Sequence, residues 1–294
     1  RYIYIRNYMP HKIYGQYISY MFKTPTTQKW HDLYHAGKLN SAQSKFWQAK
    51  PAEELYDLQN DRDEVNNLAG SKKHVDILNR LRKVQQAKAL EIRDLGFLPE
   101  GQIHGRSGEE APYDMGHDKK RYPLEDIMAA AQKASGLKTE DTAQLIKLLK
   151  AQDSAVRYWA AMGLLMRGEQ GVARGEKALR TALNDKSPEV ACTAAEALGR
   201  YGKGRTKTAA IDTLMKYADV SKNTVFTSML ALNGLDYTDN AAKDRLEAIS
   251  QLPSKGEVTP ARMGNYVPNL LSKIKMDMGV RVEAKPKRPR KNRK

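Results

Sequence analysis

Residues 153–168 read DSAVRYWAAMGLLMRG, and residues 187–202 read SPEVACTAAEALGRYG. One pattern appears in both, shifted by 34 residues: Val156, Ala160, Ala161, Leu164 and Gly168 correspond to Val190, Ala194, Ala195, Leu198 and Gly202. Apolar residues that recur three and four positions apart predict a helix with one buried face. A helical unit repeated at a fixed period is typical of a solenoid, in which each unit buries its apolar face against its neighbours.

More helices of the same kind surround these two copies. A weaker copy begins near Val225, and a last helix near residues 269–276 is expected to cap the array. Partner helices are predicted at Glu176–Leu183, Lys207–Tyr217 and Lys243–Leu252, with an earlier pair at Leu124–Ala134 and Glu140–Lys150. Four pairs exceed the roughly three that a solenoid needs for a continuous core. Residues 123–280 are therefore predicted to form an all-α solenoid, and the pattern resembles short HEAT-type repeats.

The first 99 residues have a different character. Residues 1–8, RYIYIRNY, alternate as a strand does, and Glu53–Leu58 reads as a second strand. A helix with a buried face is expected between residues 77 and 95. Two strands and one helix make too small a core to stand alone, so we expect residues 1–99 to complete a domain whose N-terminal part precedes Arg1. Residues 100–122, rich in glycine and charge, are expected to be a linker.

Composition limits the possible classes of protein. The chain has 294 residues, of which 40% are apolar, and no run approaches the 18 to 20 apolar residues of a membrane span. With one cysteine there is no intrachain disulfide, so cysteine usage does not fix the redox compartment. The net charge is +16, of which +7 lies in residues 281–294, where eight Lys or Arg accompany one Glu. This tail is expected to be disordered.

Residues 50–69, KPAEELYDLQNDRDEVNNLA, carry a resemblance to a known family. The stretch resembles the C-terminal signature of type I sulfatases: an acidic-Leu-Tyr-Asp strand, an Asn-Asp turn and a run that ends in Asn-Asn-Leu-Ala. Arg62 stands where that family usually has proline. Residues 1–20 are similar to the heparan N-sulfatase-like, or sulfamidase-like, members. The resemblance covers about residues 1–98 and predicts an α+β C-terminal sulfatase subdomain ahead of the solenoid.

The resemblance implies a large N-terminal catalytic domain, folded like alkaline phosphatase, that would contact residues 1–99. In such enzymes a formylglycine made from Cys or Ser in a C/S-x-P-x-R motif attacks sulfate, and a calcium ion polarises the sulfate oxygens. The single Cys192 lacks that motif, so formylglycine and calcium are expected only in the missing domain, and the chain alone is predicted to be inactive. Sulfated polysaccharide as substrate and a periplasmic or secreted location are implied by resemblance alone.

Three residues are candidates for binding an anionic sugar. By analogy with the sulfatase C-terminal subdomain, whose first loop can reach substrate, these are Arg6, His11 and Lys12. Arginine and lysine suit sulfate and carboxylate partners. The alternative is that these residues brace the interface to the missing catalytic domain.

The remaining chemical signals favour structural roles. Cys192 is expected to be a core residue of a repeat helix. Asp61, Asp63 and Glu64 are predicted to begin a helical turn, because a calcium loop would need a glycine and alternating ligands. His31 and His35 are four apart, but no third metal ligand is evident, so no metal site is predicted.

Two classes of function remain open from the sequence. The chain is predicted to be the C-terminal part of a sulfatase that hydrolyses sulfate esters or N-sulfates. The alternative is a non-catalytic HEAT-repeat scaffold that presents its solenoid to a partner protein. The basic tail could hold polyanions, but no nucleic-acid-reading module accompanies it, so we do not expect nucleic acid to be the partner.

Overall fold

The computed structural model describes residues 1–256 and 259–279. The chain is mostly helical and has one sheet of two strands, β1 (Tyr2–Arg6) and β2 (Glu53–Asp57). The helices are α1 (Pro25–His35), α2 (Ser41–Ser44), α3 (Val75–Glu91), α4 (Glu100–Ser107), α5 (Pro112–His117), α6 (Leu124–Ser135), α7 (Thr142–Leu148), α8 (Ser154–Met166), α9 (Gly168–Ala182), α10 (Pro188–Tyr201), α11 (Gly204–Ala218), α12 (Val225–Tyr237), α13 (Leu246–Ser250) and α14 (Tyr266–Asp277). None of these helices is both long enough and apolar enough to cross a bilayer. The predicted disordered tail, 281–294, lies outside the described residues.

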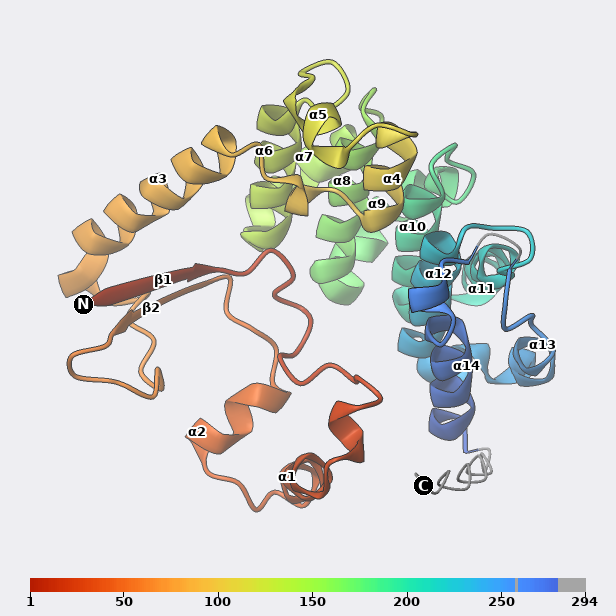
Figure 1. Ribbon diagram of the computed structural model, residues 1–294, viewed down its shortest axis with the longest axis horizontal. Helices are drawn as coiled ribbons and strands as arrows, with labels where there is room; N and C mark the ends of the chain where they lie inside the picture. The colour runs from red at the N-terminus through yellow and green to blue at the C-terminus, as the bar shows by residue number, and fades with distance from the viewer. Residues whose placement is uncertain (257–258, 280–294) are drawn as a thin grey trace, which may run out of the picture.

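From α6 onward the helices form the predicted array of pairs. Every second helix packs against the next to form one layer, namely α6, α8, α10, α12 and α14 (Figure 1). The helices between them, α7, α9 and α11, pack against this layer. One continuous apolar core runs through the array from Leu124 to Ile274. The helical period read from the sequence therefore agrees with the observed fold.

The small residues of the repeats let neighbouring helices approach closely. A Cβ atom on Gly163 of α8 would lie 2.9 Å from the Cα atom of Ala134 on α6 and 2.8 Å from Cδ1 of Leu145 on α7. Only glycine fits at such a contact. Asp153 caps the start of α8, because its carboxylate accepts hydrogen bonds from the amides of Ala155 at 2.7 Å and Val156 at 3.3 Å.

The segment expected to be a linker is structured, which corrects that expectation. Residues 100–122 contain α4 and α5, and the side chains of Met115 and Tyr122 are fully buried. Pro112 starts α5 instead of interrupting structure, as proline does in the first turn of a helix. Gly105, Gly108 and most of the charged side chains of this segment are exposed, while the buried side chains of Met115 and Tyr122 join the core of the repeats.

The two predicted strands are confirmed and form an antiparallel pair in which Tyr4 lies opposite Leu55. Helix α3 packs against β1 (Figure 1). The helical turn predicted at residues 61–64 is wrong. Glu64 adopts a left-handed φ of 53°, and the Asp61 carboxylate instead closes a turn by accepting the amides of Val65 and Asn66 at 3.1 and 2.8 Å.

Residues 11–49 form a small aromatic lobe that projects from the sheet (Figure 1). Trp47 is its buried centre, and Trp30 stacks on Phe46 with 4.7 Å between ring centroids. Gly15 lies so close to the Trp47 ring that a Cβ atom there would be 2.7 Å away. The helices α1 and α2 both belong to this lobe.

Candidate functional site at the junction of the sheet and the repeats

The chain that leaves β1 runs across the layer formed by α6, α8, α10, α12 and α14. Arg6 contacts Ser135 at the end of α6, and the Tyr8 ring lies edge-on to Trp159 of α8, with 6.1 Å between centroids. Further along, Lys12 contacts Glu196 of α10. The order of contacts along the segment thus follows the order of the repeats.

The same segment reaches the last helix of the layer. The ammonium of Lys273, on α14, lies 5.4 Å from the centroid of the Tyr17 ring. The Asn269 side chain, also on α14, donates a hydrogen bond to the Ser19 hydroxyl at 3.4 Å. Residues 6–19 therefore span the layer from its first helix to its last, and we call them the crossing segment.

Arg6 joins β1, β2 and α6. Its guanidinium donates to the carbonyl oxygen of Ala52 at 2.6 Å and to the Ser135 hydroxyl at 2.6 Å. The same guanidinium lies 5.0 Å from the centroid of the Tyr8 ring. These contacts use the planar fork of arginine to hold three elements together.

Lys12 makes the central ionic contact of the junction. Its Nζ lies 3.2 Å from a carboxylate oxygen of Glu196 and 3.2 Å from the centroid of the Tyr237 ring of α12. The side chains are 15% and 7% exposed for Lys12 and Glu196, so the pair is largely removed from water. Burial lowers the pKa of Lys12, and the Glu196 carboxylate opposes that shift. Arg200 of α10 also contacts Glu196, at 3.3 Å.

His11 is enclosed beside this ion pair. Within the described part of the chain neither of its ring nitrogens has a hydrogen-bond partner. Burial, followed by the positive charges of Lys12, Arg200 and Lys50, lowers the pKa of His11 to about 3. The imidazole is therefore neutral at neutral pH, and protonation would place a third cation next to Lys12 and Arg200.

Glu54 of β2 holds the crossing segment from the other side. Its carboxylate accepts hydrogen bonds from the hydroxyls of Tyr14 and Tyr56, and from the Asn7 amide at 2.6 Å. The pKa of Tyr14 is raised by burial and by this carboxylate. The segment is thus fixed between the sheet and the repeats by a network of polar contacts.

The structure gathers the three predicted sugar-binding residues at one junction and directs two of them at the protein itself. The cations of Arg6 and Lys12 contact α6, α10 and α12, while the ring nitrogens of the partly buried His11 are enclosed beside them. Their predicted contact with an anionic sugar stays a prediction.

Sequence reasoning missed the partner residues Glu196 and Tyr237. A signal for Glu196 exists: it lies 34 residues after Met162, so a charge occupies a position that is apolar in the preceding repeat.

Cys192, His31 and His35 each contact other side chains of the protein. Cys192 is buried on α10, as expected, and burial raises the pKa of its thiol. His31 and His35 lie on α1 with their Nε2 atoms 2.9 Å apart, and the His31 ring packs edge-on against Trp47 with 4.9 Å between ring centroids. Within residues 1–256 and 259–279, no group of three His, Cys, Asp or Glu side chains is arranged to hold a metal ion.

The chain is similar to HEAT repeats and, over part of its length, to a sulfatase. The profile of a family described as HEAT repeats matches residues 142–233. The chain is also similar to an ulvan-active sulfatase of Formosa agariphila, at 38% identity over 104 residues. The match covers 35% of this chain and 17% of that protein, so the similar stretch spans less than a fifth of the relative. No solved structure matches the chain.

Proposed function

We propose that this chain is the C-terminal part of a sulfatase that acts on sulfated polysaccharides, and that its HEAT repeats hold the sulfatase subdomain in place. The observation that carries the proposal is the 38% identity with an ulvan-active sulfatase over 104 residues. The signature at residues 50–69, with its strand, turn and Asn-Asn-Leu-Ala run, supports assigning residues 1–99 to that subdomain.

The sheet supports the proposal because it is too small to be stable alone. Two strands with one covering helix give little core, and an isolated pair of strands is only marginally stable in water. A groove of about 430 Å³ lies between β1 and α3, lined in part by Tyr2, Tyr4 and Leu81. Val84 and Ile92 of α3, which also line it, are 59% and 52% exposed. A preceding catalytic domain would cover these apolar side chains, with a gain of about 25 cal/mol for each Å² buried.

The chemistry of the reaction is assigned to that preceding domain. No C/S-x-P-x-R motif occurs in the 294 residues, and the described residues hold no metal-ligand cluster. We therefore propose that formylglycine and calcium belong to the preceding domain, and no step of catalysis is assigned to this chain. Arg6, His11 and Lys12 are proposed as positioning residues that fix the crossing segment on the repeats.

The scaffold alternative needs a free layer of repeats to bind a partner. In this structure the crossing segment already lies along α6, α8, α10, α12 and α14. This arrangement favours an internal, supporting role for the repeats.

The test compares the 294-residue chain with the protein extended by its upstream coding sequence. Both are incubated with ulvan, and released inorganic sulfate is measured by ion chromatography. The extended protein is expected to release sulfate and the 294-residue chain to release none. Sulfate released by the shorter chain, or a start codon directly before Arg1, would contradict the proposal.

A further inference from the structure

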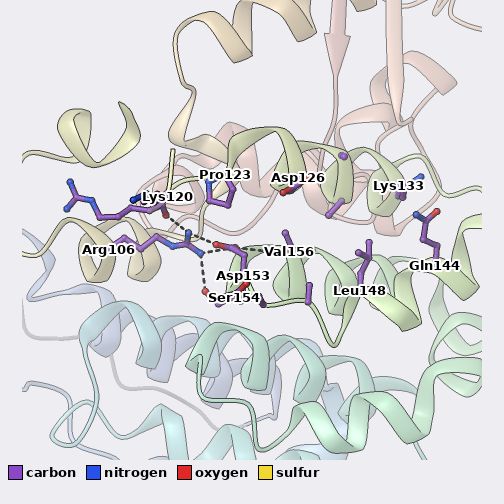
Figure 2. Close-up of a pocket in the computed structure, with 15 residues that line it drawn as sticks. Arg106, Lys120, Pro123, Asp126, Lys133, Gln144, Leu148, Asp153, Ser154 and Val156 are labelled. Atoms are coloured by element: carbon purple, nitrogen blue, oxygen red, sulfur yellow. Dashed lines mark hydrogen bonds and ion pairs between the residues drawn. The ribbon is translucent and has the colours of Figure 1, made fainter. Parts of the chain in front are cut away.

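A second surface feature lies at the start of the repeats, away from the crossing segment. It is a groove of about 840 Å³ bounded by the loop before α6, by α6 and α7, and by the start of α8 (Figure 2). One end carries Arg106 and Lys120, and the other carries Lys133 and Gln144. Part of its wall comes from residues 100–122, the segment that folds against the repeats.

One face of α6 forms a long side of the groove. Asp126, Ala129, Ala130 and Lys133 all line it, and their spacing of three, four and seven residues places them on one face of the helix. At 1.5 Å per residue, Asp126 and Lys133 are about 10 Å apart along the helix axis. The small alanines leave the groove open, and Leu148 adds apolar surface to its floor.

Several polar side chains in the groove have hydrogen-bonding capacity that the protein does not use. Within the described residues, Lys120 forms no ion pair, and the side chains of Asp126, Gln144 and Gln152 form no hydrogen bonds. The Lys133 ammonium is 3.9 Å from Asp141, beyond hydrogen-bond distance.

Arg106 differs from these residues because its role is structural. Its guanidinium binds both carboxylate oxygens of Asp153 at 2.8 and 3.0 Å. It also donates to the Arg121 carbonyl oxygen at 2.7 Å. Arg106 therefore fixes the wall of the groove, whereas Lys120 forms no ion pair within the described residues and Lys133 has one long ion pair, to Asp141 at 3.9 Å.

We propose that this groove binds a short segment of a sulfated saccharide. The ammonium groups of Lys120 and Lys133 suit sulfate. The two glutamine amides and the Asp126 carboxylate suit sugar hydroxyls, and the alanines and Leu148 suit the apolar face of a sugar ring. The choice of ligand rests on the proposed function, since a sulfatase acting on polysaccharide would gain a second hold on its substrate here.

The test is lysine footprinting of the full chain by acetylation, read residue by residue with mass spectrometry. The probe is a set of short ulvan oligosaccharides, with chemically desulfated oligosaccharides as the second arm. The sulfated probe is expected to protect Lys120 and Lys133, and to leave exposed Lys177 of α9 reactive. Because acetylation is read at each lysine, binding at the groove is distinguished from binding at the basic tail, residues 281–294. Absence of protection, or equal protection by the desulfated probe, would overturn the proposal.

Two variants, each with a matched control, test whether the protection of the lysines depends on the groove or on surface charge in general. Ala129→Trp fills the groove without changing charge and is expected to abolish protection of both lysines. Ala173→Trp, at an exposed position of α9, is its control and is expected to leave protection unchanged. Lys133→Glu is expected to increase, by about tenfold, the probe concentration needed to protect Lys120. Lys177→Glu is expected to leave that concentration unchanged. Thermal unfolding checks that each variant folds.

Unchanged protection in Ala129→Trp would overturn the assignment to the groove. Binding is measured without turnover, so this result and the sulfate-release assay can fail independently of each other.

Discussion

The repeats and the sheet subdomain are stabilised in different ways. The repeats share one apolar core, to which three of the first 99 residues, Ala89, Phe97 and Leu98, contribute buried side chains. Helix α1 in the aromatic lobe has no buried residue. The first 99 residues meet the repeats through partly buried apolar side chains, such as Tyr8 and Leu95, and through polar contacts, such as Arg6 with Ser135 and Lys12 with Glu196. The difference indicates that the subdomain depends on the repeats more than the repeats depend on the subdomain.

The largest expected loss of stability comes from a substitution in the apolar core of the repeats. Trp159 is buried on α8, and its indole nitrogen donates to the Phe97 carbonyl oxygen at 2.8 Å. Trp159→Ala should lower the free energy of unfolding by about 3–5 kcal/mol, because it leaves a cavity in the core. Trp30→Ala in the aromatic lobe, where the ring is only partly buried, should cost about 1 kcal/mol. Denaturant unfolding measures both, and equal costs would contradict the comparison.

The next prediction concerns the pH dependence of stability that His11 gives to the junction of the sheet and the repeats. The pKa of His11 is lowered to about 3 in the folded protein from its ordinary value of 6.5, so the unfolded state takes up the proton first as pH falls. Stability from this group is therefore complete above pH 6.5 and is lost as pH falls from 6.5 toward 3. Between pH 7 and pH 5 the loss should be about 2 kcal/mol.

The control for His11 is a histidine that lies outside the junction. His11→Asn should remove this part of the pH dependence, whereas His117→Asn, on the exposed side of α5, should keep it. The measurement is the free energy of unfolding at several pH values between 5 and 7. Parallel pH profiles for the wild type and His11→Asn would show that His11 is not enclosed.

The smallest effect compares helix caps in the two regions. Asp153 caps α8 in the repeats and also binds Arg106, whereas Asn40 caps the short exposed helix α2. Asp153→Ala should cost about 2 kcal/mol, because it removes the cap and leaves a partly buried guanidinium unpaired. Asn40→Ala should cost about 0.5–1 kcal/mol. Thermal unfolding measures both, and a larger cost at Asn40 would reverse the ranking.

Much of the fold could be predicted because its signals are local. The 34-residue repeat of Val156 and Val190 fixes helix period and pairing, and alternation in residues 1–8 fixes a strand. The structure of residues 100–122 could not be predicted this way. Its order depends on Met115 and Tyr122, which are buried in the core shared with the repeats, and no short-range pattern reports such contacts.

The junction was predicted only in part. Arg6, His11 and Lys12 were singled out by resemblance, but the direction of their side chains depends on where the crossing segment meets the repeats. Lys12 and Glu196 are 184 residues apart, and a single sequence carries no record of that pairing.

The contact between Lys12 and Glu196 tests the central claim most directly, namely that the crossing segment lies on the repeats. The measurement is a double-mutant cycle of Lys12→Met and Glu196→Gln by denaturant unfolding, with the exposed pair Lys88 and Glu91 as control. We predict a coupling energy of about 1–2 kcal/mol for the junction pair and less than about 0.5 kcal/mol for the exposed pair. A coupling near zero between Lys12 and Glu196 would contradict the account.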